Sequence, residues 1–434
     1  MSVVDAPGSA RGGAATGSAR VVILGAGFAG LSACEALAAD AEAAGLEIVI
    51  VDRHTYNTFQ PLLYQVATAG LNPGDIAYPV RSFLRRHPSV SFRQGAAAGV
   101  DLDRREVLFE GDGPPLAYDY LVIATGATTN FFGVAGAGEH SLAIYTMEDA
   151  LAVRDRVARS MERAATFGVS GGELTVVLVG GGPTGVEMAG TLAELRSLDL
   201  ATTYPEIRPD EARIVLVERQ DHLLDGFHPK SSSYALRALR RRGVEVRLSS
   251  AVMEVGLDHV VLEDDEKIAC GTVVWSAGVR AGLLAERLDV AKVQGGRLEV
   301  TPALQLTGHP EVFVAGDVAG ARLAPGSASL VPQLAQPALQ EGRHAALQLL
   351  RLRRGLPLDP FRYRDKGIMA TIGRRAAVAE LPGGLRLSGT VAWLAWLGLH
   401  LVFLLGFRNR VAVLLNWAWR YVWWRRGTRV IAGT

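Results

Sequence analysis

The chain has 434 residues and a formal net charge of +1, so no overall electrostatic field points to nucleic acid as a partner. Its length suggests two or three domains, and its 49 glycines suit the tight turns of nucleotide-binding folds. The two cysteines, Cys34 and Cys270, are far apart and form no CxxC motif. This excludes a disulfide framework and fits a reducing compartment.

The first element follows a tail of residues 1–19 that is rich in Gly, Ala and Ser. The tail lacks the apolar core of a signal peptide, so we expect a flexible segment and a protein that is not secreted. A buried strand at residues 20–24 then leads into Gly25-x-Gly27-x-x-Gly30 and an Ala/Leu-rich helix, and the next strand ends in Asp52. This order is typical of a dinucleotide site.

Each residue of this motif has a physical reason. Gly25 allows the tight turn, Gly27 lets the backbone approach a pyrophosphate, and Gly30 lets the helix pack closely on the strand. The helix N-terminus offers free N–H groups to the phosphates. Asp52 can accept hydrogen bonds from a ribose.

The same order recurs downstream, where a strand leads into Gly180-x-Gly182-x-x-Gly185, a helix, and a strand that ends in Glu218. One GxGxxG is a weak signal, but two with complete flanking elements are a strong one. Two sites imply two nucleotides, most economically a resident flavin and an exchanging nicotinamide. Glu218 favours NADH, because a carboxylate repels the 2′-phosphate of NADPH, although the adjacent Arg219 weakens this inference.

Three later strands complete the predicted architecture. The segments 121–127 and 273–279 end in small residues, and the segment 312–320 ends in Gly316-Asp317 after the second half. The chain is therefore expected to return and complete its first domain. We predict an α/β fold with two Rossmann-like dinucleotide-binding domains, the second inserted in the first, plus a C-terminal helical membrane-association segment.

Several segments make the chain resemble the two-dinucleotide-domain flavoprotein reductases and, more narrowly, the type II NADH dehydrogenases. These are single-subunit NADH:quinone oxidoreductases. The likeness rests on GAGFAG, HTYNTFQPLLYQVATAGLNPGDIA, GGGPTGVEMAGTLAEL, LLDGFHPK, GDVAG, VPQLAQPALQEG, FRYRDKGIMATIGRRAAVAE and the tail containing GFRNR. The AQPALQEG block and the tail are the most discriminating parts.

The resemblance implies tightly but non-covalently bound FAD, with NADH and a quinone as substrates. It divides the chain into an FAD-binding domain (20–140 and 300–350), an NADH-binding domain (141–299) and a C-terminal membrane-association region (351–434). It implies electron transfer without proton pumping, since the sequence lacks several spanning helices.

The resemblance also assigns site residues. The expected FAD-binding residues are Gly25, Gly27, Phe28, Ala29, Gly30, Asp52, Arg53, Ala124, Thr125, Gly126, Asp317, Ala335 and Gln336. The expected NADH-binding residues are Gly180, Gly182, Pro183, Thr184, Gly185, Glu187, Glu218, Ala277 and Gly278. The expected quinone-binding residues are Pro61, Leu62, Tyr64, Gln336 and Gln340. The catalytic candidates are Glu187, Gln336 and Lys366.

These catalytic candidates have plainer interpretations as well. Glu187 could position the nicotinamide or supply protons, or it could interact with the N-terminus of its own helix. Gln336 and Gln340 would share one face of a helix over residues 333–350, where they could equally be solvated. That helix would point its N-terminus at the flavin and stabilise the reduced, anionic form. Lys366 could be an ordinary surface lysine.

Absent motifs help to choose among related enzymes. The nine histidines show no metal-ligand spacing, so no metal site is expected. Disulfide reductases and sulfide:quinone oxidoreductases use reactive cysteines, which Cys34 and Cys270 do not match. Two other functions remain open: an NAD(P)H reductase with a soluble acceptor, and a non-catalytic NADH-binding redox sensor.

The tail, residues 391–424, holds six of the seven tryptophans. A helix from Val391 to Phe407 would be about 25 Å long at 1.5 Å per residue, short of a hydrocarbon core roughly 30 Å thick. Two helices on the cytoplasmic face of the cell membrane would keep every arginine cluster beside anionic lipid. The alternatives are a helical pair packed on the protein's own sheet, a homodimer interface and a spanning hairpin.

Overall fold

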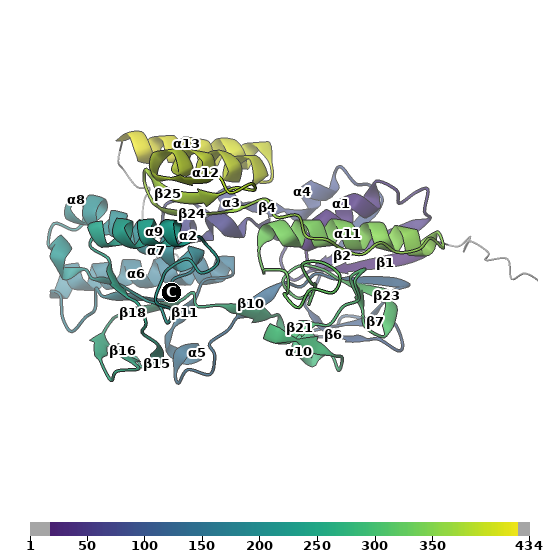
Figure 1. Ribbon diagram of the computed structural model, residues 1–434, viewed down its shortest axis with the longest axis horizontal. Coiled ribbons are helices and arrows are strands. Elements are labelled where there is room, and N and C mark those ends of the chain that lie inside the picture. The colour runs from purple at the N-terminus through teal and green to yellow at the C-terminus, as the bar shows by residue number, and fades with distance from the viewer. Residues whose placement is uncertain (1–17, 424–434) are drawn as a thin grey trace, which may run out of the picture. The chain divides into compact units, whose positions relative to one another are not determined.

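The structure is a computed structural model that describes residues 18–423, and its chain divides into two compact units (Figure 1). The first comprises the described part of Met1–Thr55 with Pro79–Ala127 and Ala281–Arg364. The second comprises Tyr56–Tyr78, Thr128–Arg280 and the described part of Asp365–Thr434. Almost all of the tail predicted at residues 1–19 lies outside the described residues.

The first unit is built on a six-stranded sheet with strand order β22-β23-β9-β1-β2-β5. Its strands are β22 (Gln305–Leu306), β23 (His309–Val314), β9 (Tyr120–Ile123), β1 (Ala19–Leu24), β2 (Leu46–Asp52) and β5 (Val90–Gln94). All neighbours are parallel except β22 and β23. The central strands consist mainly of buried Val, Ile and Leu, as strands covered on both faces require.

Two helices of the first unit pack tightly together, α1 (Phe28–Ala38) and α11 (Ala335–Arg353). A Cβ at Gly342 of α11 would overlap the backbone of Ala29 in α1, so the contact requires glycine. The helix expected over residues 333–350 therefore exists but begins and ends later. The other elements of this unit are α4 (Val80–Leu84), β6 (Ala97–Asp101), β7 (Glu106–Phe109), β8 (Leu116–Ala117), α10 (Leu283–Arg287), β20 (Lys292–Val293), η4 (Gln294–Gly296) and β21 (Arg297–Leu298).

The second unit contains a parallel sheet with strand order β11-β18-β12-β13-β14. Its strands are β11 (Leu142–Ala143), β18 (Thr272–Trp275), β12 (Val176–Val179), β13 (Ile214–Val217) and β14 (Glu245–Arg247). Its longer helices are α6 (Met147–Phe167), α7 (Pro183–Glu194) and α9 (Pro229–Arg241). The segment that forms this sheet lies between β9 and β23 in sequence, which confirms the predicted insertion of one dinucleotide-type fold in the other.

Smaller elements complete the second unit. They are β3 (Tyr56–Thr58), η1 (Gln60–Leu62), α2 (Leu63–Ala67), α3 (Pro73–Ile76), α5 (Ala137–His140), the π-helix η2 (Leu195–Leu200), α8 (Ala201–Thr203), η3 (Pro209–Glu211), β15 (Val252–Val255), β16 (His259–Leu262) and β17 (Lys267–Ala269). At the points where the chain passes from one unit to the other stand β4 (Ala77–Pro79), β10 (Ala127–Thr129) and β19 (Val279–Ala281).

The C-terminal part of the second unit is an antiparallel sheet of β24 (Ile368–Gly373), β25 (Ala376–Glu380) and β26 (Arg386–Ser388), followed by two helices. The helices are α12 (Gly389–Phe403) and α13 (Phe407–Trp423). The predicted helix from Val391 to Phe407 is therefore shorter. It ends at Phe403 because the backbone of Leu404 is extended, with a ψ of 130°.

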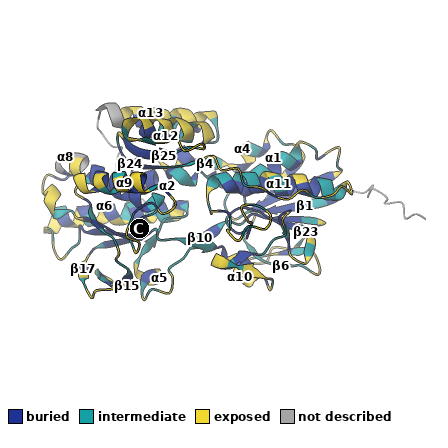
Figure 2. Cartoon of the chain, in the orientation of Figure 1, coloured by how far each residue is buried: buried dark blue, intermediate teal, exposed yellow. Residues whose placement is uncertain are grey.

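The outer surfaces of α12 and α13 are exposed, whereas β24 and β25 beside them are mostly buried (Figure 2). Their exposed large apolar side chains are Val391, Leu394, Leu399, Val402, Phe403, Phe407, Val411, Leu414, Leu415 and Trp419. The inner side of α12 packs Ala392 and Trp393 against Ala377 and Ala379 of β25. Within residues 18–423, no helix combines the length and the apolar character needed to cross a membrane.

The two units do not coincide with the three predicted domains. Residues 56–78 belong with the C-terminal helices, because Asn409 donates to the Ala77 carbonyl, Asn416 to the Asp75 carboxylate and Trp417 to Gln65, each at 2.8 Å. The sequence placed this segment in the first domain and the C-terminal region in a domain of its own. Side-chain contacts between such distant segments leave no local signal in the sequence.

Candidate functional site

The first glycine turn joins β1 to α1 in the first unit. Gly25 has a φ of 103°, and a Cβ at Gly30 would overlap the Gly25 carbonyl, so both positions require glycine. A Cβ at Gly27 would meet no atom within 4 Å, so the backbone there faces open space that a pyrophosphate can enter. Phe28, Ala29 and Gly30 form the first turn of α1.

Asp52 holds this turn in shape. Its Oδ2 accepts a hydrogen bond from the Ala26 N–H at 2.6 Å, and its Oδ1 accepts one from the His54 N–H at 2.8 Å. Each carboxylate oxygen keeps a further lone pair for a ligand. Arg53 follows directly at the end of β2. The sequence predicted a ribose contact for Asp52, and the structure adds a local contact of this carboxylate with its own glycine turn.

The other predicted FAD residues of this unit surround the same end of the sheet. Ala124, Thr125 and Gly126 follow β9, and Asp317 follows the Gly316 turn after β23. The Thr125 hydroxyl is buried and has no hydrogen-bond partner among the described residues, which suits a ligand atom at this place. Ala335 and Gln336 are the first two residues of α11, where backbone N–H groups lack intrahelical partners.

Glu341 is a buried acid that the sequence analysis missed. Its Oε2 accepts a hydrogen bond from the Gly316 N–H at 2.6 Å, and it therefore positions the turn that presents Asp317. Burial, with a smaller contribution from the nearby Asp317, raises the pKa of Glu341 to about 8, although the Gly316 N–H and Arg297 oppose the rise. Only its place in the AQPALQEG block could have drawn attention to it.

The second glycine turn repeats this geometry in the second unit. Gly180 has a φ of 109°, Gly185 packs against the Gly180 carbonyl, and a Cβ at Gly182 would meet open space. Glu218 takes the place of Asp52: its Oε2 accepts from the Gly181 N–H at 2.6 Å and its Oε1 from the Gln220 N–H at 2.7 Å. The residue types at matching positions thus build the same turn twice.

The remaining predicted NADH residues lie beside this turn. Pro183 and Thr184 begin α7, where proline costs no hydrogen bond. Ala277 lies against the backbone of Gly180, and Gly278, with a φ of 157°, follows it after β18.

Glu187 is buried on α7 and contacts a distant strand. Its Oε1 accepts a hydrogen bond from the Thr371 N–H of β24 at 3.3 Å, rather than interacting with the N-terminus of its own helix. Burial raises the pKa of Glu187 to about 8, while the Thr371 N–H and the Trp396 indole oppose the rise. A carboxyl with such a pKa can hold or release a proton near neutral pH. Neither Thr371 nor Trp396 was among the predicted residues.

Three predicted quinone residues lie on two adjoining short helices of the second unit. Pro61 and Leu62 belong to η1, and Tyr64 belongs to the adjoining α2, which contacts α7. The Tyr64 hydroxyl accepts a hydrogen bond from Gln65 at 2.9 Å, and the Tyr64 ring meets the edge of Trp396 with centroids 6.2 Å apart. The structure therefore gathers Glu187 and Tyr64 around α12.

The other candidates have simpler surroundings. Gln340 of α11 uses both ends of its amide on the backbone of Arg364, donating to its carbonyl and accepting from its N–H, each at 3.0 Å. Lys366 is exposed just before β24. No cluster of His, Cys, Asp and Glu within the described part of the chain could hold a metal ion.

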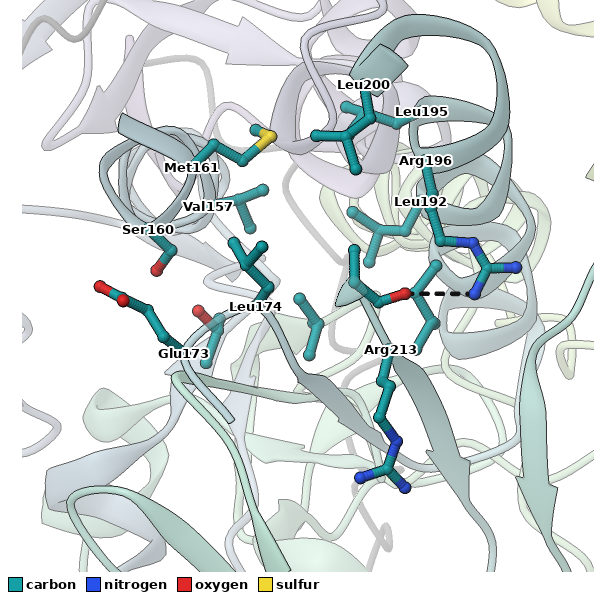
Figure 3. A pocket seen from close by; sticks show the side chains of 14 residues that line it. Val157, Ser160, Met161, Glu173, Leu174, Leu192, Leu195, Arg196, Leu200 and Arg213 are labelled. Atoms are coloured by element: carbon teal, nitrogen blue, oxygen red, sulfur yellow. Dashed lines mark hydrogen bonds between the residues drawn. The ribbon is translucent and has the colours of Figure 1, made fainter. Parts of the chain in front are cut away.

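A separate pocket in the second unit contains none of the predicted site residues. Apolar side chains of α6, α7 and η2 line it, among them Val157, Met161, Leu192 and Leu200 (Figure 3). At its edge the Arg196 guanidinium donates to the Ala212 carbonyl at 3.3 Å. Neither glycine turn contributes to its lining, so we do not assign the active site to it.

The fold and the paired turns define a class of flavoprotein reductase, and comparisons with known proteins agree. Residues 19–342 match the family described as pyridine nucleotide-disulphide oxidoreductase, and residues 366–426 match the NDH2 C-terminal domain. The fold is similar to that of NDH2 from Plasmodium falciparum solved in complex with NADH, with a TM-score of 0.85 at 20% identity over 94% of this chain and 99% of that one.

Two curated relatives narrow the class. The chain is 38% identical to the type II NADH:quinone oxidoreductase NdhA of Mycobacterium tuberculosis (strain ATCC 25618 / H37Rv), over 96% of this chain and 90% of the relative. It is 36% identical to Ndh of the same organism, over 95% of this chain and 90% of that relative. The chain belongs to the type II NADH:quinone oxidoreductase family. The predicted resemblance and fold class are thereby confirmed.

Proposed function

We propose that this protein oxidises NADH and passes the electrons through bound FAD to a membrane quinone, without pumping protons. The observation that supports it most is the pair of glycine turns, each tied to an acidic strand end, in a chain that also has the C-terminal domain of this family. FAD supplies a hydride acceptor that can release its electrons to a second substrate. The protein's own residues bind and orient the reactants and exclude water.

We assign FAD to the first unit. Three features suit a dinucleotide: the open backbone at Gly27, the N–H groups at the start of α11, and the Thr125 hydroxyl, which has no partner among residues 18–423. Asp52 and Arg53 are proposed for the adenosine end and Asp317 for the ribityl chain. Ala335 and Gln336 are proposed beside the isoalloxazine ring.

We assign NADH to the turn that precedes α7 in the second unit, from Gly180 to Gly185. Glu218 would accept a hydrogen bond from the adenosine ribose through the lone pairs that Gly181 and Gln220 leave open. Ala277 and Gly278 are proposed for the nicotinamide side. The carboxylate at Glu218 favours NADH over NADPH.

On the quinone side, Glu187 is the proposed proton-holding group. It is buried and needs only a small change in its surroundings to gain or lose a proton near neutral pH. Tyr64 and the η1 residues Pro61 and Leu62 are proposed to line the quinone path. Gln336, Gln340 and Lys366 remain proposed quinone-side residues whose roles rest on the family resemblance.

The exposed apolar faces of α12 and α13 are proposed to lie on the bilayer surface. Arg375, Arg386, Arg408 and Arg410 are exposed near the ends of these helices and would meet anionic lipid on the cytoplasmic face. A homodimer that covers part of the same surface is the alternative occupant. A further arginine cluster that the membrane prediction included, Arg425, Arg426 and Arg429, lies outside the described residues.

One rapid-mixing experiment tests this function. The enzyme-bound flavin is reduced with NADH in the absence of oxygen and then mixed with menaquinone or ubiquinone analogues in lipid. We expect both half-reactions to be fast enough for turnover. Reoxidation no faster than by air would contradict the proposal and favour a redox sensor. Fast reoxidation only by soluble acceptors would favour a soluble-acceptor reductase.

A further inference from the structure

The surroundings of the Glu187 carboxyl come from three segments that are distant in sequence. Glu187 lies on α7, the Thr371 N–H of β24 donates to its Oε1 at 3.3 Å, and Trp396 of α12 lies beside it. Glu187 is 8% exposed, Thr371 4% and Trp396 1%. A carboxylate enclosed to this degree depends on the few donors that face it, because water does not compensate for them.

Trp396 has one donor, and that donor is otherwise unused. Its indole N–H is buried and forms no hydrogen bond of normal geometry with any described residue. The indole nevertheless lies close enough to Glu187 to favour the ionised carboxylate. Buried tryptophan N–H groups usually find an acceptor, so an unpaired one next to an acid calls for an explanation.

The indole is held in place on several sides. It stacks on His400 with centroids 3.9 Å apart and an interplanar angle of 23°, and the His400 Nδ1 faces the Trp396 carbonyl at 2.7 Å. The ring of Trp417 lies 6.0 Å away, and its own N–H donates to Gln65 at 2.8 Å. Such packing fixes where the Trp396 N–H points.

We infer that Trp396 is a positioning residue for Glu187: its indole N–H, together with the Thr371 N–H, holds the ionised carboxylate in one place. This inference rests on the proposed function only in so far as Glu187 acts in the reaction. Trp396 itself is not assigned a contact with a substrate. The ionised acid gains a second donor through this arrangement, whereas the protonated acid does not depend on it.

The titratable neighbours of Glu187 do not offer a competing explanation. On α12, burial lowers the pKa of His400 to about 4, so that its ring is neutral at physiological pH. On α2, the Tyr64 hydroxyl is bonded to Gln65. Farther along α7, Glu194 bonds to the backbone N–H of Arg374 after β24. Within the described residues, burial raises the pKa of Glu187, and Thr371 and Trp396 lower it. No charged partner contributes to the shift.

The test is the Trp396→Phe variant of the full-length holoenzyme, which keeps a ring against His400 but removes the N–H. Infrared difference spectroscopy titrates the Glu187 carboxyl directly, with Glu187→Gln identifying its band. Removing a donor to the ionised form should raise the pKa of Glu187 by about one pH unit. The matched control is Trp393→Phe, the same change one turn earlier on α12 against β25, which should leave the titration unchanged.

A second readout separates this inference from the proposed role of Glu187. Glu187→Gln should abolish one limb of the pH profile of quinone reduction, and Trp396→Phe should shift that limb along the pH axis. When Glu187 is already replaced by Gln, Trp396→Phe should not change the profile further. A shifted infrared titration with an unshifted pH profile would support the positioning role and reject the catalytic role of Glu187. An unshifted infrared titration would overturn the inference. If Trp396→Phe fails to retain flavin, Trp396→Met, which also lacks a donor, tests the same expectation.

Discussion

Asp52 and Glu218 each combine two tasks in one carboxylate. Each accepts a backbone N–H from its glycine turn and another from two residues farther along the chain, and each is proposed to bind a ribose. A carboxylate at these positions therefore shapes the turn, in addition to its proposed part in selecting the nucleotide. Substitutions that remove the charge and substitutions that remove the acceptor should differ in effect.

This difference gives a prediction for Glu218. Glu218→Ala should relax the preference for NADH over NADPH and also lower kcat/KM for NADH, because the Gly181 and Gln220 N–H groups lose their acceptor. Loss of a charged hydrogen bond costs about 1.5–3 kcal/mol, so the fall should be roughly tenfold to a hundredfold. Glu218→Gln keeps one of the two acceptor oxygens and should relax the preference with a smaller fall. Steady-state kinetics with both nucleotides measures this, and an unchanged NADH/NADPH ratio in Glu218→Ala would reject the role.

At the scale of elements, the contact between α7 and β24 places Glu187 beside Thr371. A Cβ at Gly190 of α7 would overlap the Ile372 carbonyl of β24, so the two elements approach as closely as their backbones permit. Gly190→Ala should force them apart and destabilise the protein by about 1–3 kcal/mol. It should also raise the pKa of Glu187, since the Thr371 N–H moves away.

Gly398 provides the control for this prediction. It lies in the exposed part of α12, where a Cβ would meet no atom within 4 Å. Gly398→Ala should stabilise the protein by about 0.5–1 kcal/mol, because alanine favours the helix more than glycine does. Thermal unfolding of both variants, with flavin bound, provides the comparison. Equal behaviour of the two variants would show that the approach at Gly190 is not tight.

Local patterns predicted the elements, and distant contacts escaped prediction. The glycine turns depend on a few adjacent residues and one acid at the next strand end, so the sequence contains all the information needed to place them. Thr371 lies 184 residues from Glu187, and no periodicity links the two. Trp396 is a second example: the composition of the tail suggested contact with lipid, but the Trp396 indole points into the protein. The tail helix was predicted too long because leucine at position 404, where the backbone becomes extended, is no sequence signal for a helix end.

Among residues 18–423, two buried carboxyls have raised pKa values, those of Glu187 and Glu341. Burial raises the pKa of Glu187 and of Glu341 to about 8, against 4.5 for an exposed glutamate. Between these values the folded protein holds protons that the unfolded chain has released. Each group therefore stabilises the fold fully below its unfolded pKa, and that stability is lost as the pH rises through its folded pKa.

The resulting prediction concerns stability against pH. The free energy of unfolding should fall between about pH 4.5 and 8, with each carboxyl contributing a slope of up to about 1.4 kcal/mol per pH unit. Glu341→Gln, which cannot ionise, should lose its share of this slope while keeping an acceptor for the Gly316 N–H. Chemical unfolding of the holoenzyme at several pH values measures the slope. Parallel curves for wild type and Glu341→Gln would contradict the assignment.

Removal of the tail tests the attachment of the whole molecule. Truncation after Glu380 deletes α12 and α13 with their exposed apolar faces, so the shortened protein should no longer sediment with anionic liposomes. The full-length enzyme with Arg408 and Arg410 both changed to Gln should sediment less at low salt than wild type. If the truncated chain still sediments, the anchor lies elsewhere.

The two-sided character of α12 means that this anchor is not an interchangeable module. One side of the helix offers Val391, Leu394 and Val402 to the surroundings, while the other encloses Glu187 with Trp396. Fusing an unrelated amphipathic helix to the truncated chain should therefore return it to liposomes without returning the pH response of the native enzyme. Residues that meet lipid and residues that enclose the acid must change together, so the lipid environment of the enzyme and the chemistry of its buried acid are constrained by one short stretch of sequence.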